Sequence, residues 1–299
     1  MTSRSTKISK YTGRFFPAEK LVILSIVLLS LLILADYFAH GNNLFLIPVS
    51  LLVILIFCFL PEGRQRFSER PFLFFIFCSF SLLGYAYLYK LVGALVNFLG
   101  NRWYDEVLVR LDRLIFGFSP NLAIVKYHQV WLTELMLFAY IVYLPLLVWL
   151  AWMIFRTKGQ VELQSYLLTL GLAYVTCFLI FIIVPAASPR FYFSELKPAA
   201  GLLLRRLMNL VEVSAQYRGG SFPSAHCAAG TVMVYYAWQA QKKVFLIVAP
   251  MIVLFFISTI YGQYHYGVDV LAGIIIGMIA TLLSKFLELK GKAKTIKTR

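Results

Sequence analysis

Charged residues are scarce in this chain of 299 residues. Asp, Glu, Lys and Arg make up 14% of it, while hydrophobic residues make up 61%. Soluble domains carry about a quarter charged residues, so this composition excludes an ordinary soluble protein. Acidic residues are rarer than basic ones: the chain has 13 Asp and Glu against 28 Lys and Arg, which gives a net charge of +15. We assign this positive charge to cytoplasmic loops and anionic lipid, and we expect no nucleic-acid partner.

Cysteines are also few, and none of the four belongs to a CxxC pair. All four lie inside or at the edge of apolar segments, where buried free thiols are the usual state. We therefore expect no disulfide framework. The chain also lacks tandem repeats and low-complexity segments, and no linker marks a domain boundary.

Long apolar runs, in contrast, repeat along the whole chain. Each is about 20 residues long, which is the length of a helix that crosses a bilayer, and is too long and uniform for a barrel strand. The first run exceeds the core of a cleavable signal, so we interpret it as a span. Gly273 and Gly277 form a small-residue packing face in the last run. We predict an all-α polytopic membrane bundle of about eight helices: 21–39, 44–60, 71–89, 131–155, 166–184, 224–240, 244–261 and 266–287.

The distribution of Lys and Arg predicts the orientation of these spans. With eight spans, 18 of the 28 basic residues lie on the side that holds both termini, which the positive-inside rule assigns to the cytoplasm. Basic tails at 1–20 and 288–299 flank a peripheral unit of three spans and an interfacial helix at 21–130 and a membrane core at 131–287. We expect an integral protein of the plasma (inner) membrane. The sequence indicates no particular oligomeric state.

Two segments outside the spans are amphipathic. Over 102–115 the charged residues, Asp105 and Asp112 among them, fall on one helical face and the apolar residues on the other. Residues 201–212 repeat the pattern more weakly. We expect both to be interfacial helices on the outer side of the membrane. The loop around the second segment holds five basic residues that an anionic substrate or lipid phosphates would explain: Arg190, Lys197, Arg205, Arg206 and Arg218.

Three short motifs at the ends of spans carry the chemistry. The topology, which was set by charge alone, brings all three to the outer face at similar depth. Together they supply two histidines, one carboxylate and one arginine, which suits a reaction at phosphate. The motifs are Ser221-Phe222-Pro223-Ser224-Ala225-His226, Tyr264-His265-Tyr266-Gly267-Val268-Asp269 and Pro185-Ala186-Ala187-Ser188-Pro189-Arg190.

The two histidines suit different roles. His265 and Asp269 are four residues apart and share a helix face. A hydrogen bond from one ring nitrogen to the carboxylate would fix the tautomer and leave the other nitrogen as a nucleophile. A purely structural His–Asp bridge is the alternative. His226 lies near a helix N-terminus, where the dipole disfavours its charged form. A pKa brought near the working pH in this way would suit a proton donor.

A bound phosphate would need cations and N–H groups. Gly220, Ser221 and Ser224 belong to a loop that enters a helix, and the free N–H groups there would form an anion site. Arg190 would add a bidentate clamp on the phosphate oxygens. Three further residues near the same face are candidates to line the pocket: Glu134, Tyr140 and Tyr264.

A zinc site is a second interpretation of some of these residues. His226, Cys227, His265 and Asp269 could all be ligands. Adjacent His and Cys would strain one tetrahedral ion, and Arg190 would repel a cation. We therefore predict no metal and no cofactor.

At these residues the chain resembles the type-2 phosphatidic acid phosphatase superfamily, also called lipid phosphate phosphatases. That family's second motif is Pro-Ser-Gly-His, where this chain has Pro223-Ser224-Ala225-His226. The first motif of that family has a lysine well before an Arg-Pro pair. In this chain the arginine of the pair is retained as Arg190, but the proline comes before it. The family's third motif is Ser-Arg, five residues, His, three residues, Asp, and Thr259 replaces that arginine. The matching residues of the third motif are Ser258, His265 and Asp269.

The Ser-Phe-Pro-Ser-x-His motif, with Thr259 six residues before the third-motif histidine, resembles the inositol phosphorylceramide synthase branch. Members of that branch transfer a phosphorylated head group between lipids. The resemblance covers about 131–287 and implies a metal-independent phosphotransferase for membrane lipids. It implies His265 as nucleophile, Asp269 as its partner, His226 as acid and base, and Arg190 as phosphate binder. A lipid phosphate or diphosphate phosphatase and a non-enzymatic lipid transporter are the alternatives.

Overall fold

The computed structural model describes residues 14–100, 102–193, 196, 199–215 and 217–297, which form an all-α bundle. Seven of the predicted spans are long and apolar enough to cross a membrane. The eighth, predicted at 224–240, forms a helix of only 16 residues, Ala225–Ala240. The seven full-length spans are Pro17–His40, Leu46–Arg66, Pro71–Ala94, Val130–Lys158, Gln160–Ile183, Lys242–Tyr261 and Gly267–Leu287.

Two of the spans are divided into two helices. One divides at Phe59, and the other divides where the helix that ends at Cys78 is followed by a new helix from Ser81. Ala186 forms isolated β-bridges with Gly219 and Gly220, and these make up the β pairing among the described residues. In chain order the helices are α1 (Pro17–His40), α2 (Leu46–Cys58), α3 (Leu60–Arg66), α4 (Pro71–Cys78), α5 (Ser81–Ala94), α6 (Asp105–Phe116), α7 (Pro120–Ile124), η1 (Val125–Tyr127), α8 (Val130–Lys158), α9 (Gln160–Ile183), α10 (Pro189–Tyr192), α11 (Leu203–Ala215), α12 (Ala225–Ala240), α13 (Lys242–Tyr261) and α14 (Gly267–Lys297).

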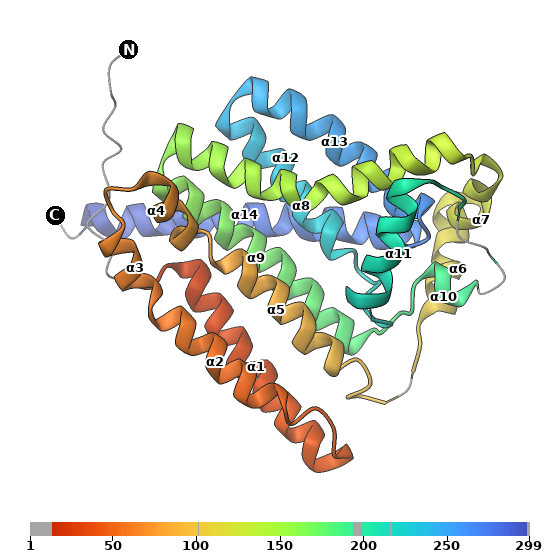
Figure 1. Cartoon of the computed structure of the whole chain (residues 1–299), viewed down its shortest axis with the longest axis horizontal. Helices are drawn as coiled ribbons and strands as arrows, with labels where there is room; N and C mark the ends of the chain where they lie inside the picture. Colours follow the sequence, from red (N-terminus) through yellow and green to blue (C-terminus); the bar gives the residue numbers. More distant parts are fainter. Residues whose placement is uncertain (1–13, 101, 194–195, 197–198, 216, 298–299) are drawn as a thin grey trace.

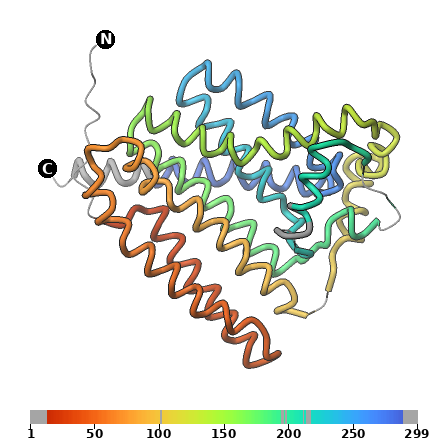
Figure 2. Tube along the Cα trace, in the orientation of Figure 1, coloured from red at the N-terminus to blue at the C-terminus, as the bar shows by residue number. Residues whose placement is uncertain are grey.

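The short helix α12 occupies the centre of the bundle. It packs against α8, α9, α13 and α14, while α1 and α5 pack on α9 from the other side. Figure 1 shows α6, α7, α10 and α11 together at one end of the bundle, opposite the end where α1 begins and α14 finishes. The tube in Figure 2 follows the same path. The three motifs lie at the end that holds the short helices.

The small-residue face of α14 is confirmed. A Cβ atom added at Gly273 would collide with the backbone oxygen of Ser224, and one added at Gly277 would collide with that of Ala228. Only glycine allows the backbones of α12 and α14 to approach this closely. The start of α12 and the start of α14 are thereby held together, and these two helix starts carry the histidine motifs.

One hydrophobic core joins the first three spans to the rest of the bundle. Ile26, Leu88 and Leu170, from three different helices, have no exposed surface and belong to the same cluster. Many large apolar side chains point outward instead, such as Leu24 and Leu282, which are 67% and 66% exposed. An apolar surface of this extent is compatible with lipid rather than water around the bundle.

Candidate active site

Backbone hydrogen bonds join the three motif segments. The N–H of Arg190 donates to the carbonyl of Gln263 at 3.1 Å, and the N–H of Ser224 donates to the carbonyl of Asp269 at 3.0 Å. Ser188 and Gln263 have positive φ angles of 89° and 60°, although neither is glycine. Backbone strain of this kind clusters at functional sites, where the surrounding contacts hold it.

His265 has two hydrogen-bond partners on the same ring nitrogen. Its Nδ1 lies 2.9 Å from the carbonyl oxygen of Ser221 and 3.4 Å from Oδ2 of Asp269. A carbonyl oxygen only accepts hydrogen bonds, so Nδ1 carries the proton and Nε2 keeps its lone pair. The carboxylate was expected to fix this tautomer, but the Ser221 carbonyl is the closer partner.

Asp269 holds the loop as well as the imidazole ring. It is fully buried, and its Oδ2 accepts hydrogen bonds from the Ser221 hydroxyl at 2.6 Å and from the Tyr266 N–H at 2.9 Å. The same carboxylate therefore connects the segment before α12 to the segment before α14. Removal of this carboxylate would disturb both segments and not only the ring of His265.

His226 lies in the first turn of α12 and faces His265. The centroids of the two imidazole rings are 6.3 Å apart. The rings of Tyr143, Tyr140 and Phe255 surround His226, with centroid distances of 5.4, 6.1 and 6.3 Å. Reacting atoms need an approach of about 3–3.5 Å on each side, so one phosphate group could contact both rings.

The loop before α12 uses its donors internally, which differs from the predicted phosphate cradle. The Ser221 N–H donates to the carbonyl of Ala186, and its hydroxyl donates to Asp269. The Ser224 hydroxyl accepts from the N–H of Cys227 and so caps α12. Gly220 participates in the backbone bridge to Ala186. These groups hold the loop in place through contacts within the protein, so they are not turned toward a ligand.

Arg190 pairs with a carboxylate that the sequence analysis did not single out. Its guanidinium lies 3.3 Å from Glu212 on α11 and over the rings of Phe191 and Tyr264, at 4.5 and 5.7 Å from their centroids. Arg205, predicted only as one of several outer cations, also pairs with Glu212. Lys197 lies outside the described residues. The motif arginine therefore neighbours the histidine cluster through Tyr264.

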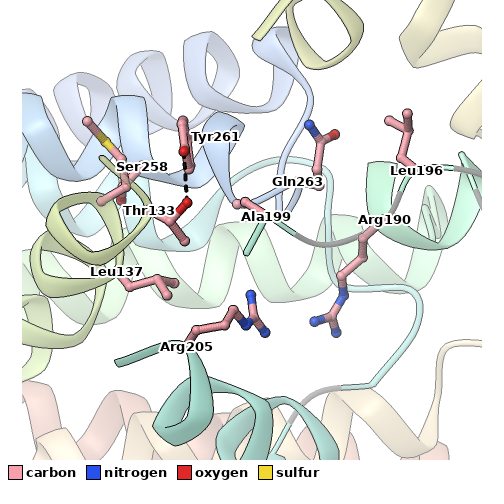
Figure 3. Close-up of a pocket in the computed structure, with 11 residues that line it drawn as sticks. Thr133, Leu137, Arg190, Leu196, Ala199, Arg205, Ser258, Tyr261 and Gln263 are labelled. Atoms are coloured by element: carbon pink, nitrogen blue, oxygen red, sulfur yellow. Dashed lines mark hydrogen bonds between the residues drawn. The ribbon is translucent and has the colours of Figure 1, made fainter. Parts of the chain in front are cut away.

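A cavity of about 230 Å³ lies beside these loops (Figure 3). Its lining contains Arg190 and Arg205 and, among the described residues, none of the three that were predicted to line a pocket. Those three have other partners. The Glu134 carboxylate accepts hydrogen bonds from backbone N–H groups at the start of α11. The ring of Tyr140 packs against that of Tyr264 in a tilted arrangement, with the two centroids 4.5 Å apart.

The interfacial helix α6 is fixed by two buried aspartates. They were expected on its charged outer face, but Asp105 is 2% exposed and Asp112 is fully buried. Asp105 accepts hydrogen bonds from the N–H groups of Ala187 and Ser188 and from the Tyr266 hydroxyl. Their spacing of seven residues places both on one face, and this spacing was the only signal of their shared function.

Asp112 caps the N-terminus of α14. Its two oxygens accept hydrogen bonds from the N–H groups of Gly267 at 3.1 Å and Val268 at 2.7 Å. Burial raises the pKa of its carboxyl group, while the two N–H groups oppose that shift. Helix α6 therefore holds the segment that contains His265 from one side, and the α12 loop holds it from the other.

Replacing Asp112 with alanine is expected to destabilise the protein. Two buried N–H groups would lose their acceptor, and each such loss costs about 1–3 kcal/mol. Thermal unfolding in detergent micelles measures this change. The matched control is Glu106→Ala on the same helix, because Glu106 is 63% exposed and, among the described residues, forms an i,i+4 pair with Arg110, worth about 0.5 kcal/mol or less. Equal melting temperatures for the two variants would contradict this role of Asp112.

No group of three or more His, Cys, Asp and Glu side chains is arranged to hold a metal ion within the part of the chain that the structure describes. Cys227, the cysteine that was considered as a zinc ligand, is a buried free thiol in α12. Its backbone N–H contacts the Ser224 hydroxyl at 3.3 Å.

Comparisons with known proteins identify the family. Residues 106–283, more than half of the chain, match the PAP2 superfamily. No curated protein matches the chain. Among solved structures, the chain is similar to the first transmembrane PAP2 type phosphatidylglycerolphosphate phosphatase from Bacillus subtilis, with 20% sequence identity and a TM-score of 0.45. That similarity covers 71% of this chain and 97% of the other.

The match covers both histidines, Asp269 and Arg190, and it begins inside α6. The comparisons reach the PAP2 superfamily and do not distinguish the inositol phosphorylceramide synthase branch within it. The protein thus belongs to the PAP2 superfamily and is a membrane-embedded enzyme of the lipid phosphatase type.

Proposed function

We propose that this enzyme transfers a phosphorylated head group from a phospholipid to a lipid or polyol alcohol through a covalent intermediate on His265. The observation that carries the proposal is the facing pair of imidazole rings, 6.3 Å apart, one of which has its Nδ1 bound to the Ser221 carbonyl. That contact supports a free lone pair on Nε2 of His265. A nucleophile held in one tautomer beside a second imidazole fits acid–base-assisted transfer.

In the first step Nε2 of His265 attacks phosphorus in line with the leaving oxygen. A nitrogen–phosphorus bond forms, the bond from phosphorus to the leaving oxygen breaks, and His226 gives its proton to that oxygen. Asp269 stabilises the positive charge that develops on the His265 ring. Arg190 binds the phosphate oxygens, where positioning and charge supply most of the catalysis of phosphoryl transfer.

In the second step an alcohol attacks the same phosphorus atom. Its proton passes to His226, the bond from phosphorus to Nε2 breaks, and the ring of His265 returns to its starting state. With water in place of the alcohol the same steps make the enzyme a phosphatase. No metal takes part in either step.

Two observations favour an alcohol over water as the acceptor. The Ser221–His226 motif and Thr259 resemble the inositol phosphorylceramide synthase branch, whose members transfer head groups. In addition, three aromatic rings surround His226, from Tyr140, Tyr143 and Phe255. Such apolar surroundings favour an amphiphilic alcohol as the acceptor.

We also propose the orientation of the protein in the plasma (inner) membrane. Both termini would lie in the cytoplasm and the histidine pair at the extracytoplasmic face. The excess of Lys and Arg in the tails and in the loops on their side supports this orientation. Helix α14 begins at the end of the bundle that holds α6, α7, α10 and α11, opposite the start of α1 (Figure 1), which agrees with this orientation.

A substrate panel tests the proposed function. Purified protein in micelles is given short-chain phosphatidic acid, a lipid diphosphate, or phosphatidylinositol with and without ceramide, each with chelator present. We expect the head group to appear on the added lipid alcohol, with no loss of turnover in chelator. Release of free phosphate alone would make the enzyme a phosphatase. Loss of turnover in chelator would contradict the metal-independent mechanism, and no turnover on any substrate would favour the transporter.

A further inference from the structure

Three hydrogen-bond donors from different parts of the chain converge on the carboxylate of Glu212. Arg190 approaches one oxygen at 3.3 Å, and Arg205 approaches the other at 2.7 Å. The hydroxyl of Tyr264 donates to that second oxygen at 2.7 Å. The side chains of Arg190, Arg205 and Glu212 are only 18%, 11% and 18% exposed, so solvent screens this cluster poorly.

The charges in this cluster do not balance. Two guanidinium groups face a single carboxylate, which leaves an excess of one positive charge in a poorly hydrated place. Burial, followed by the neighbouring Glu212 charge, raises the pKa of the Tyr264 hydroxyl well above its usual value, so it remains a donor. Inorganic phosphate or a phosphate monoester carries up to two negative charges and offers more acceptor oxygens than a carboxylate, so it matches these donors better than Glu212 does. A phosphodiester carries one negative charge, as Glu212 does, and would compete with that carboxylate for the same donors.

Both arginines also line the cavity of about 230 Å³. Figure 3 shows the guanidinium ends of the two side chains turned toward each other. The Glu134 carboxylate fixes the backbone of Arg205 by accepting its N–H at 3.2 Å, and the Arg190 N–H is held by Gln263. The two cations are thus attached to fixed backbone, as a preformed binding site requires.

We propose that Arg190, Arg205 and the Tyr264 hydroxyl form a phosphate-binding site whose internal occupant in this structure is the Glu212 carboxylate. The inference rests on the proposed function to the extent that the phosphate belongs to the lipid substrate. Free inorganic phosphate has the same chemistry and would bind the same donors. Displacement requires only that the Glu212 side chain rotate away from the two arginines.

The proposed site shares a wall with the histidine pair. Tyr264 directly precedes His265, and its ring packs at a tilt against that of Tyr140, whose ring centroid lies 6.1 Å from that of His226. A lipid phosphate held by the arginines would therefore lie beside the reacting groups. Arg205 supplies a second cation that the motif residues themselves do not contain.

Opposite effects of two substitutions test this site. Inorganic phosphate is titrated into the purified full-length protein in micelles, and its affinity is read from thermal stabilisation. Arg205→Gln should weaken phosphate binding about 10-fold or more, since it removes a charged donor. Glu212→Gln should tighten binding about 10-fold, since it removes the competing carboxylate. The control Arg206→Gln removes the same charge from an exposed neighbouring position and should leave binding unchanged.

A merely structural ion pair predicts a different result. Both substitutions would then lower the melting temperature, and neither would change phosphate affinity, or both would weaken it. Either result would overturn the proposal. Tyr264→Phe removes only one hydroxyl and provides the same test, by weaker binding, if Arg205→Gln does not fold. If phosphate stabilised each of these variants as strongly as it stabilises the wild type, the proposal would likewise be overturned.

A second titration distinguishes the source of the phosphate. Short-chain phosphatidic acid is compared with the matching diacylglycerol, which lacks the phosphate. Stabilisation by the phosphatidic acid alone, weakened in Arg205→Gln, would assign the site to the lipid head group, and an effect of inorganic phosphate alone would assign it to the free ion. An equal effect of the diacylglycerol would contradict the site. These measurements need no turnover, so they stand even if His265→Ala proves active.

Discussion

Replacing His265 with alanine is expected to lower turnover by about 10⁴-fold or more, because a nucleophile and its partners act as a unit. The structure gives a specific reason for an effect of this size. The Ser221 carbonyl and Asp269 both bind Nδ1, so the ring is held with Nε2 available for attack. No other described side chain has this combination of tautomer, burial and proximity to His226. The initial rate of product formation from the best substrate of the panel measures the effect.

His40→Ala is the matched control for this substitution. His40 also forms an i,i+4 pair with an aspartate, Asp36, at 2.8 Å, but its side chain is 54% exposed at the end of α1. It lies at a distance from the motif loops in sequence and has no contact with them among the described residues. We expect normal turnover from His40→Ala. Turnover near the wild-type rate in His265→Ala would remove the nucleophile from the mechanism.

Replacing His226 with alanine is expected to lower turnover about 10²- to 10⁴-fold, the usual contribution of a general acid and base. The loss should depend on the leaving group. An alkoxide needs a proton as it departs, whereas p-nitrophenolate departs without one. We therefore expect the first turnover on a p-nitrophenyl phosphodiester to survive in His226→Ala and to be lost in His265→Ala. The burst of p-nitrophenol in rapid mixing separates the first step from the second.

An equal loss of that burst in both variants would contradict the separate roles. His226 would then be needed for binding or for the shape of the site and not for proton transfer to the leaving oxygen. His226→Asn provides a check on packing, because it keeps a polar side chain beside Tyr143 and Phe255. It should behave like the alanine variant if the proton matters, and like the wild type if only packing does.

The spans, the small-residue packing face of α14 and the meeting of the motifs followed from elementary patterns. About 20 apolar residues predict a span, and two glycines four residues apart predict close helix packing. The pairing of His265 with Asp269 followed from their i,i+4 spacing. These features are local or depend on membrane geometry, so one sequence is enough to predict them. The bounds of α12 also agreed with the prediction to within one residue, at Ala225–Ala240 against 224–240.

The contacts between distant segments could not be predicted. The Ser221 carbonyl beside His265 depends on how a loop enters α12, and hydropathy contains no information about such a path. Asp112 was assigned to a water-facing surface because a charged residue on an amphipathic helix usually belongs there. Its burial reflects α14 N–H groups that only the tertiary structure brings near. The meeting of Arg205 with Glu212 and Arg190 also depends on the packing of α11.

Trapping of the intermediate is the most direct test of the mechanism. The enzyme is mixed with a lipid substrate labelled with ³²P, quenched in alkali within one turnover, and digested for peptide mapping. The mechanism predicts an alkali-stable, acid-labile label on the peptide that contains His265, absent from His265→Ala and retained with p-nitrophenyl substrate in His226→Ala. Full turnover with no label on the protein, or a label that persists in His265→Ala, would contradict it.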